Sequence, residues 1–401
     1  MAAQEYQAPE SVSRLQQRAY LVGGIALLVS IFGAVRTPEL FFPSYLMSFL
    51  LILGLTVGSL GLLTLQHLTG GHWGIIIRRP LESATRALPL MVIAFLPIAI
   101  FGMKYLYAGH GDEKGWLNAP PTGEGALSEF QNGYLTQTGF HIRWVIYFAI
   151  WLALMFIFNI LSKRQDTNPE DRALRLRFKM LAGPGIILYV FAMTFASIDW
   201  VMSLSPHWAS TIYGFLFVAG QLISSMSLMI AVVVLLARTE PFASALQKRH
   251  LHDLGKLLLA FVMLWAYFDF SQLLIIWSGN QPEEITFYRT RLYGGWGVVA
   301  VIVLVFHFFV PFFLLLSHDV KRNAKVLPRI AIWLIFMRLV DLFWMTRPEF
   351  TSRAMPTWLD IVLPLALGGL WLGFFAFNLK QCPLLPLGDP ELAEAIEHHE
   401  H

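Results

Sequence analysis

The chain is poor in charge and almost free of cysteine. Only 14% of its 401 residues are charged, against roughly 25% in soluble domains. The single cysteine, Cys382, excludes internal disulfides, iron–sulfur clusters held by cysteine thiolates and cysteine-rich zinc sites. The net charge of +3 is small. It gives no reason to expect a nucleic-acid partner, because the basic residues follow a membrane topology.

Apolar residues fill the chain instead. They make up 56% of it, and the mean hydropathy is +0.58. A soluble globule does not need this much apolar surface, so we expect an all-α polytopic membrane protein. Ten apolar runs approach the ~20 residues that cross a bilayer. They cover about 19–36, 44–66, 84–103, 142–162, 181–201, 211–236, 254–277, 294–317, 328–346 and 357–379.

Lysine and arginine predict the topology. If both termini are cytoplasmic, the cytoplasmic segments hold 20 basic residues and the opposite connections hold 8, as the positive-inside rule requires. The densest group lies between Lys163 and Lys179. The polar segment 1–18 lacks the basic-then-apolar order of a signal peptide. We therefore expect segments 1–18 and 380–401 to be cytoplasmic.

A faint internal repeat divides the chain. The fifth run ends in Asp199-Trp200, and the ninth carries Asp341 and Trp344. This correspondence predicts two four-helix bundles, spans 2–5 and 6–9, flanked by spans 1 and 10. Region 19–201 then holds span 1 and the first bundle, 211–346 the second bundle, and 357–379 span 10. Many transporters are also built from repeats.

Four ionisable residues interrupt the later runs: Asp269, His307, Arg338 and Asp341. A charge at the bilayer centre costs at least ~2.5–3.5 kcal/mol on insertion scales, so such residues usually face an interior or an aqueous path. Arg338 and Asp341 are three residues apart and therefore share a helix face. They form either a self-neutralised structural pair or part of a proton path.

Asp269 has no basic residue within a helical turn. Ser271 and Gln272 beside it suit a water-assisted proton relay, and the alternative is a structural, hydrogen-bonding acid. His307 precedes Pro311 by four residues, so its carbonyl is expected to lack the usual helical partner. This histidine is either a proton shuttle or a packed side chain at a kink.

Histidine also bears on redox cofactors. A transmembrane b-type haem needs paired axial histidines inside the bundle, and of 12 histidines only His307 lies near mid-membrane. We therefore predict neither haem nor iron–sulfur cluster in this chain, and no metal site.

A second polar group gathers at the end of spans 3–5 away from the cytoplasm. Aromatic residues at this depth usually form an interface belt. An acid, imidazoles and tryptophan around a bundle mouth are alternatively a contact site for a quinone head group. The candidates for this contact are Lys104, His141, Asp199, Trp200 and His207.

Several motifs carry a family resemblance. The stretch from Asp199 to Gly214, DWVMSLSPHWASTIYG, resembles the smaller NrfD-like membrane subunit, the F subunit, of bacterial alternative complex III. The runs LHDLGK (251–256), WAYFDFSQ (265–272) and YRTR (288–291) fit the same family. The resemblance covers roughly residues 19–380.

The resemblance implies a role in the bacterial cytoplasmic membrane. The complex is a quinol:cytochrome c (or other acceptor) oxidoreductase, and its iron–sulfur clusters and c-type haems sit in other subunits. Implied partners are a larger NrfD-like subunit, an iron–sulfur subunit, multihaem and monohaem c-type cytochrome subunits, lipids and a terminal oxidase. The chain itself would supply a proton path and a quinone contact. A proton-coupled secondary transporter and a purely structural anchor are the alternatives.

Overall fold

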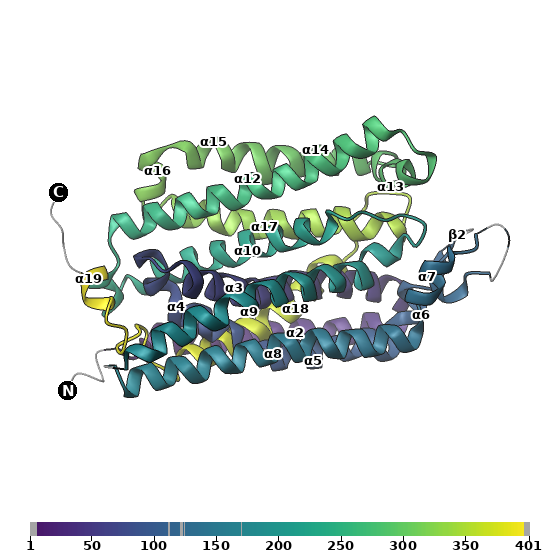
Figure 1. Ribbon diagram of the computed structural model, residues 1–401. Helices are drawn as coiled ribbons and strands as arrows, with labels where there is room; N and C mark the ends of the chain where they lie inside the picture. Colours follow the sequence, from purple (N-terminus) through teal and green to yellow (C-terminus); the bar gives the residue numbers. More distant parts are fainter. Residues whose placement is uncertain (1–5, 111–112, 121–122, 124, 170, 397–401) are drawn as a thin grey trace.

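The computed structural model describes residues 6–110, 113–120, 123, 125–169 and 171–396, and most of them lie in long helices (Figure 1). Nine helical segments of this described part are long and apolar enough to cross a membrane. The prediction of an all-α polytopic membrane protein is confirmed at this level. The nine segments are Glu10–Arg36, Pro38–Thr69, His72–Leu106, Gln137–Thr167, Ala173–Leu204, Tyr213–Leu236, Lys248–Gly279, Trp296–Leu316 and Leu359–Leu379.

These segments contain the principal helices, which carry the labels of Figure 1. They are α2 (Glu10–Arg36), α3 (Pro38–Thr69), α4 (His72–Thr85), α5 (Leu88–Pro97), α6 (Met103–Leu106), α8 (Gln137–Thr167), α9 (Arg172–Trp200), α10 (Tyr213–Leu236), α12 (Lys248–Gly279), α14 (Trp296–Val303), α15 (Val310–Leu316) and α18 (Leu359–Leu379).

A further long helix, α17 (Leu327–Thr346), has 20 residues. It matches the predicted ninth run, but every stretch of 18 residues in it contains Arg329, Arg338 and Asp341, whereas each of the nine segments has an apolar stretch of that length with at most two charged residues. It packs along α10 and also contacts α3 and α14. Its length and position are those of a membrane helix whose two inner charges, Arg338 and Asp341, are covered by neighbouring helices.

Helices from the two halves of the chain pack tightly at the centre. Every residue in the most apolar stretch of α3 is buried, and α3 contacts α10 as well as α4, α9 and α18. A Cβ at Gly58 would lie 2.5 Å from the backbone oxygen of Gln221, and the hydroxyls of Ser59 and Ser225 are hydrogen-bonded at 2.6 Å. Small residues permit this close helix approach, as is common in membranes.

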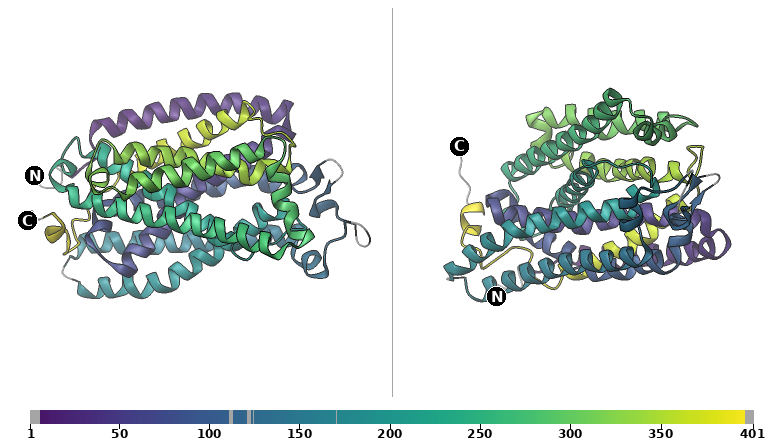
Figure 2. Two further views of the ribbon diagram at one scale, coloured as in Figure 1. Left: turned by 90° about the horizontal axis from the view of Figure 1, so that it is seen from above. Right: turned by 45° about the vertical axis from the view of Figure 1, so that its right-hand side comes forward.

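The first and last long helices, α2 and α18, lie side by side at one edge of the molecule (Figure 2, left). A Cβ at Gly23 would lie 2.5 Å from the backbone nitrogen of Leu370, so the two backbones nearly touch. α18 also packs on α3, where the Trp371 indole donates to the Thr56 hydroxyl at 2.7 Å.

The two ends of the described chain meet at one end of the bundle. The amide of Leu384 donates to the carbonyl of Tyr6 at 2.9 Å, and Lys380 Nζ donates to Ser13 Oγ at 3.3 Å. We call this the terminal end. It also carries α11 (Phe242–Ala245), α16 (His318–Arg322) and α19 (Leu392–Ile396). An even number of helices therefore crosses between the two ends.

The opposite end, here called the α13 end, carries short elements between the long helices. The connection after α6 contains strands β1 (Gly109–His110) and β2 (Glu113–Lys114), paired antiparallel, a 3₁₀ turn (Trp116–Asn118) and α7 (Glu129–Tyr134). Further 3₁₀ turns cover Met202–Leu204 and Arg347–Glu349.

The sequence pattern did not predict α13 (Pro282–Leu292), which lies between two long helices at this end. Proline begins it, Glu283 and Glu284 occupy its first turn, and Arg289 and Arg291 its last. The acidic residues lie at the positive N-terminal end of the helix dipole and the basic residues at its negative C-terminal end, so both placements stabilise the helix. Proline is common at the first position of a helix.

Two membrane helices contain π-helical turns next to prolines, at Ile98–Gly102 and Leu304–Phe309. The second turn includes His307, whose carbonyl we expected Pro311 to leave without its usual partner. In the i→i+5 spacing of a π-helix, the N–H missing from Pro311 is also withheld from the carbonyl of Phe306. The carbonyl of Phe306 accepts a hydrogen bond from the Trp333 indole at 3.0 Å, so a side chain of α17 supplies the missing donor.

Candidate functional site

Arg338 and Asp341 form a buried ion pair on α17, and each side chain is only 3% exposed. The predicted contact between them is confirmed. The guanidinium lies over the Phe217 ring and presses on α10 at Gly220, where a Cβ would come within 2.3 Å of Arg338 Cζ. Glycine at this position therefore makes room for the buried charge.

A pocket of about 620 Å³ opens beside this pair, between α12, α13, α14, the Leu304–Phe309 turn and α17. Both Asp269 and Asp341 line it, so the structure brings two of the predicted residues together. Its other walls are mostly apolar or aromatic. They are Met263, Trp265, Ala266, Tyr267, Phe270, Leu273, Tyr288, Leu292, Gly297, Ala300, Val301, Val303, Leu304, Phe308, Phe309 and Trp344.

The carboxyl group of Asp269 lies in the pocket wall. Among the described residues, none forms a hydrogen bond or an ion pair with it. Arg338 bonds to Asp341 and not to Asp269. The apolar run placed Asp269 near mid-span, but α12 extends over Lys248–Gly279, so the residue lies nearer the α13 end.

His307 lies behind the pocket wall. It is fully buried, and its ring meets the Trp265 ring edge to face with centroids 4.6 Å apart. Neither ring nitrogen has a hydrogen-bond partner among the described residues. His307 therefore contacts the pocket through Trp265 and does not bond directly to Asp269.

A short polar chain leads from the pocket toward the α13 end. Gln272 Nε2 donates to the Tyr288 hydroxyl at 3.3 Å, and Ser210 Oγ donates to Gln272 Oε1 at 2.9 Å. Tyr288 lines the pocket, and Ser210 lies half-buried in the connection between α9 and α10. Ser271 is half-buried beside Gln272, but its hydroxyl forms no hydrogen bond within the described part of the chain.

Tyr288 remains a hydrogen-bond donor at neutral pH. It belongs to α13, which lies outside the membrane-spanning helices. Burial raises the pKa of its hydroxyl well above the ordinary value, and the nearby Asp269 carboxyl raises that pKa further. The hydroxyl therefore keeps its proton and can also accept a bond, as a phenol does.

The predicted quinone contacts only partly converge. Asp199 is buried and bonds to Arg143 Nε at 2.8 Å and to the Tyr147 hydroxyl at 2.7 Å. Trp200 is fully buried next to it, and its carbonyl accepts from the Tyr107 hydroxyl at 3.1 Å. These two predicted residues occupy the interior of the helices that carry the first half of the chain.

The other three predicted contacts lie apart from them. Lys104 is exposed and its ammonium stacks 4.8 Å above the ring of Tyr105. His207 is exposed in the connection after α9. His141 is half-buried and accepts a hydrogen bond from the Trp144 indole at 3.2 Å. Residues that we predicted at a similar depth in the membrane therefore do not converge on one binding site.

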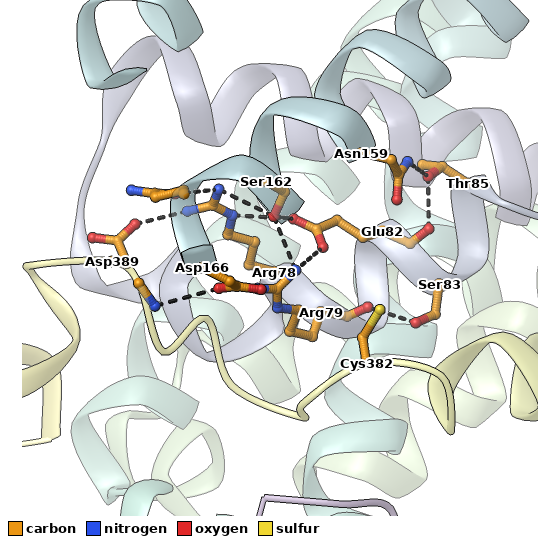
Figure 3. A network of polar contacts seen from close by, with 12 residues as sticks. Arg78, Arg79, Glu82, Ser83, Thr85, Asn159, Ser162, Asp166, Cys382 and Asp389 are labelled. Atoms are coloured by element: carbon orange, nitrogen blue, oxygen red, sulfur yellow. Dashed lines mark hydrogen bonds and ion pairs between the residues drawn. The ribbon is translucent and has the colours of Figure 1, made fainter. Parts of the chain in front are cut away.

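The sequence pattern missed a buried charge network on α4, shown in Figure 3. Glu82 receives Arg78 Nε at 3.2 Å and an Arg79 nitrogen at 2.7 Å, and Ser162 donates to it at 2.6 Å. We expected 67–83 to be a cytoplasmic connection, but α4 begins at His72 and buries these three side chains. The i,i+3 and i,i+4 spacing in RRPLE was the available signal.

The same network holds the C-terminal segment at the terminal end of the bundle. Arg78 also bonds to Asp389 at 2.7 Å, and Arg79 pairs with Asp166 on α8. The single cysteine, Cys382, accepts from Arg86 at 3.0 Å. These contacts join three separate parts of the chain and are readily explained as structural.

Comparisons with known proteins assign no role to the residues described above. In the described part of the chain, no group of three or more His, Cys, Asp or Glu side chains is placed to hold a metal ion. No protein-family model matches the sequence, and no curated protein matches it significantly.

Proposed function

We propose that this chain is an integral membrane subunit of a quinol:cytochrome c (or other acceptor) oxidoreductase complex. It contributes a proton path and has no redox centre of its own. The observation that carries the proposal is the pocket into which two carboxyl groups, Asp269 and Asp341, open, with a hydrogen-bonded chain leading away from it. The run from Asp199 to Gly214 supports the family.

The proposed route uses groups of different kinds. Asp269 has no hydrogen-bond partner in the part of the chain that the structure describes, so it can exchange a proton with water or a ligand in the pocket. The side chains of Tyr288, Gln272 and Ser210 extend from there toward the α13 end. Arg338 neutralises Asp341 and thereby lowers the cost of placing two acids at one pocket in a low-dielectric region.

The proposed membrane arrangement has ten spans, with both termini on the cytoplasmic side of the bacterial inner membrane. The contact between Tyr6 and Leu384 supports an even number of spans, because an even number of crossings returns the chain to the side where it began. The distribution of lysine and arginine supports the cytoplasmic side. α17 is then the ninth span. The partners would be the subunits that hold the iron–sulfur clusters and c-type haems.

A transporter would be favoured by helix breaks at matching places in two repeats. Both π-helical turns lie in membrane helices, one after Pro97 in the third span and one before Pro311 in the eighth. These two spans do not correspond in a repeat of four, so the breaks support the transporter less than the proton path.

The test is Asp269→Asn in membranes that contain the whole complex. Loss of a proton relay group slows its transfer step by roughly 10²-fold or more. Protons translocated per electron should therefore fall, while the quinol oxidation rate stays within about twofold of the unmodified complex, since binding and chemistry at the redox centre are unchanged.

Asp253→Asn is the matched control, because Asp253 lies on the same helix but its side chain is 46% exposed at the terminal end. It should leave both quantities unchanged. Equal loss of proton translocation and quinol oxidation in Asp269→Asn, or no loss of either, contradicts the proposed proton path.

A further inference from the structure

We infer that the pocket beside Asp269 and Tyr288 binds the head group of a hydroquinone that enters sideways from the lipid. The inference deepens the proposed function and rests on it, because a quinol-oxidising complex works in a membrane that contains hydroquinone. It differs from the sequence-based expectation, which placed a quinone contact around Asp199 and His141.

The pocket is open toward the lipid-facing surface. Several of its lining side chains are strongly exposed: Tyr267 is 64% exposed, Phe270 61% and Val301 58%. They belong to α12 and α14, two apolar membrane-spanning segments, so bilayer lipid surrounds them when the protein is in a membrane. A ligand that dissolves in the hydrocarbon layer can therefore reach the pocket without crossing water.

The polar groups select a head group that both donates and accepts hydrogen bonds. Asp269 has no protein partner among the described residues and needs a donor. Tyr288 uses its oxygen to accept from Gln272, so its proton is available for an acceptor in the pocket. A hydroxyl group on a ring satisfies both, whereas an alkylammonium only donates.

The size and the walls suit a ring. The volume of about 620 Å³ falls within the ~300–1,000 Å³ of pockets that hold small organic ligands. Trp265, Trp344 and Phe308 contribute aromatic faces, against which a planar ring can pack by offset or edge-on stacking. An apolar tail can remain between the exposed side chains at the mouth.

The alternative place is more enclosed by protein. The Asp199 carboxyl accepts from both Arg143 and Tyr147 through Oδ2, and its Oδ1, which has no hydrogen-bond partner among the described residues, is buried. A hydroxyl would therefore have to enter beside a buried ion pair, whereas the Asp269 carboxyl lies in the wall of an open pocket. The inference concerns binding alone, and oxidation of the ligand remains with the subunits that carry redox centres.

The test is photolabelling of the full-length chain in lipid nanodiscs with a short-chain azidobenzohydroquinone, kept reduced, followed by peptide mapping. The label should fall on peptides of α12 and α14, and excess unlabelled hydroquinone should prevent it. Ala300→Trp fills the pocket from α14 and should reduce labelling by about tenfold or more. Val298→Trp introduces the same side chain two residues away, where the residue is 64% exposed and outside the pocket, and it should label normally.

Asp269→Asn provides a variant of nearly unchanged shape. It should weaken competition by unlabelled hydroquinone by roughly tenfold, because a neutral amide oxygen accepts a weaker hydrogen bond than a charged carboxylate does. Labelling at the Asp199 cluster alone, equal labelling in both tryptophan variants, or competition by a lipophilic amine but not by hydroquinone would each overturn the inference.

The assay needs no electron transfer, so the two proposals can fail separately. Pocket labelling with normal proton translocation in Asp269→Asn refutes the proton path and keeps the binding site. Loss of proton translocation in Asp269→Asn, without labelling of the pocket, refutes the binding site and keeps the proton path.

Discussion

Replacing Asp341 with asparagine should destabilise the protein strongly, because it leaves a guanidinium unpaired in the interior. Arg338 and Asp341 are each 3% exposed, and Arg338 lies between α17 and α10, where Gly220 provides its space. Asparagine keeps the shape of the aspartate but carries no charge, so the variant changes the electrostatics and little else.

The magnitude follows from the burial of both partners. Removing one member of a buried ion pair typically costs about 3–5 kcal/mol, since the remaining charge is desolvated without compensation, whereas removing both is often nearly neutral. We therefore expect Asp341→Asn to lower the free energy of unfolding by about 3–5 kcal/mol. The double variant Arg338→Met/Asp341→Leu should recover most of that loss.

An exposed pair with the same spacing supplies the control. Asp253 and Lys256 are also three residues apart, with oxygen and nitrogen 3.5 Å from each other, but their side chains are 46% and 58% exposed. Water screens such a pair, which is worth at most about 1 kcal/mol. Asp253→Asn should therefore change stability much less than Asp341→Asn.

The measurement is equilibrium unfolding of the full chain in mixed detergent micelles, monitored by tryptophan fluorescence and circular dichroism. The interpretation is wrong if Asp341→Asn costs no more than Asp253→Asn. It is also wrong if the double variant is as unstable as the single one, since the loss would then come from packing and not from an uncompensated charge.

Two further changes can be tested in the same unfolding assay. Glu82→Gln removes the carboxylate shared by two buried arginines and should cost about 3–5 kcal/mol; Glu10→Gln, whose carboxylate is 91% exposed, should cost far less, and equal costs would contradict the structural role of the network. Gly220→Ala places a Cβ 2.3 Å from Arg338 Cζ and should cost about 1–3 kcal/mol by overpacking. Gly183→Ala, where a Cβ meets nothing within 4 Å, should not destabilise, and a similar loss there would refute the clash.

Helix positions were largely predictable because hydropathy along a run is a local property. The predicted run 328–346 and the observed α17 (Leu327–Thr346) agree closely, as do 357–379 and α18 (Leu359–Leu379). Helix ends were less predictable where polar residues extend the helix beyond its apolar part. α12 begins at Lys248, six residues before the apolar run at 254, and α4 was taken for a connection.

Site contacts were predictable only within one helix. Arg338 and Asp341 could be paired from their spacing, because i and i+3 always share a face. The i,i+4 relation of Arg78 and Glu82 carried the same information. Nothing local could indicate that Asp269 and Asp341 face one pocket, because they lie on different helices and their approach depends on how α12 and α17 pack.

The sequence by itself determined that the chain is a helical, multi-span membrane protein with ionisable residues inside its later spans, since length, hydropathy and charge spacing are properties of the linear chain. The tertiary structure decided which of those residues have partners. It paired Arg338 with Asp341, enclosed His307 behind Trp265, and left Asp269 at a lipid-facing pocket. The physical reason is that pairing and cavity formation depend on helix rotation and packing, which residues distant in the sequence set together.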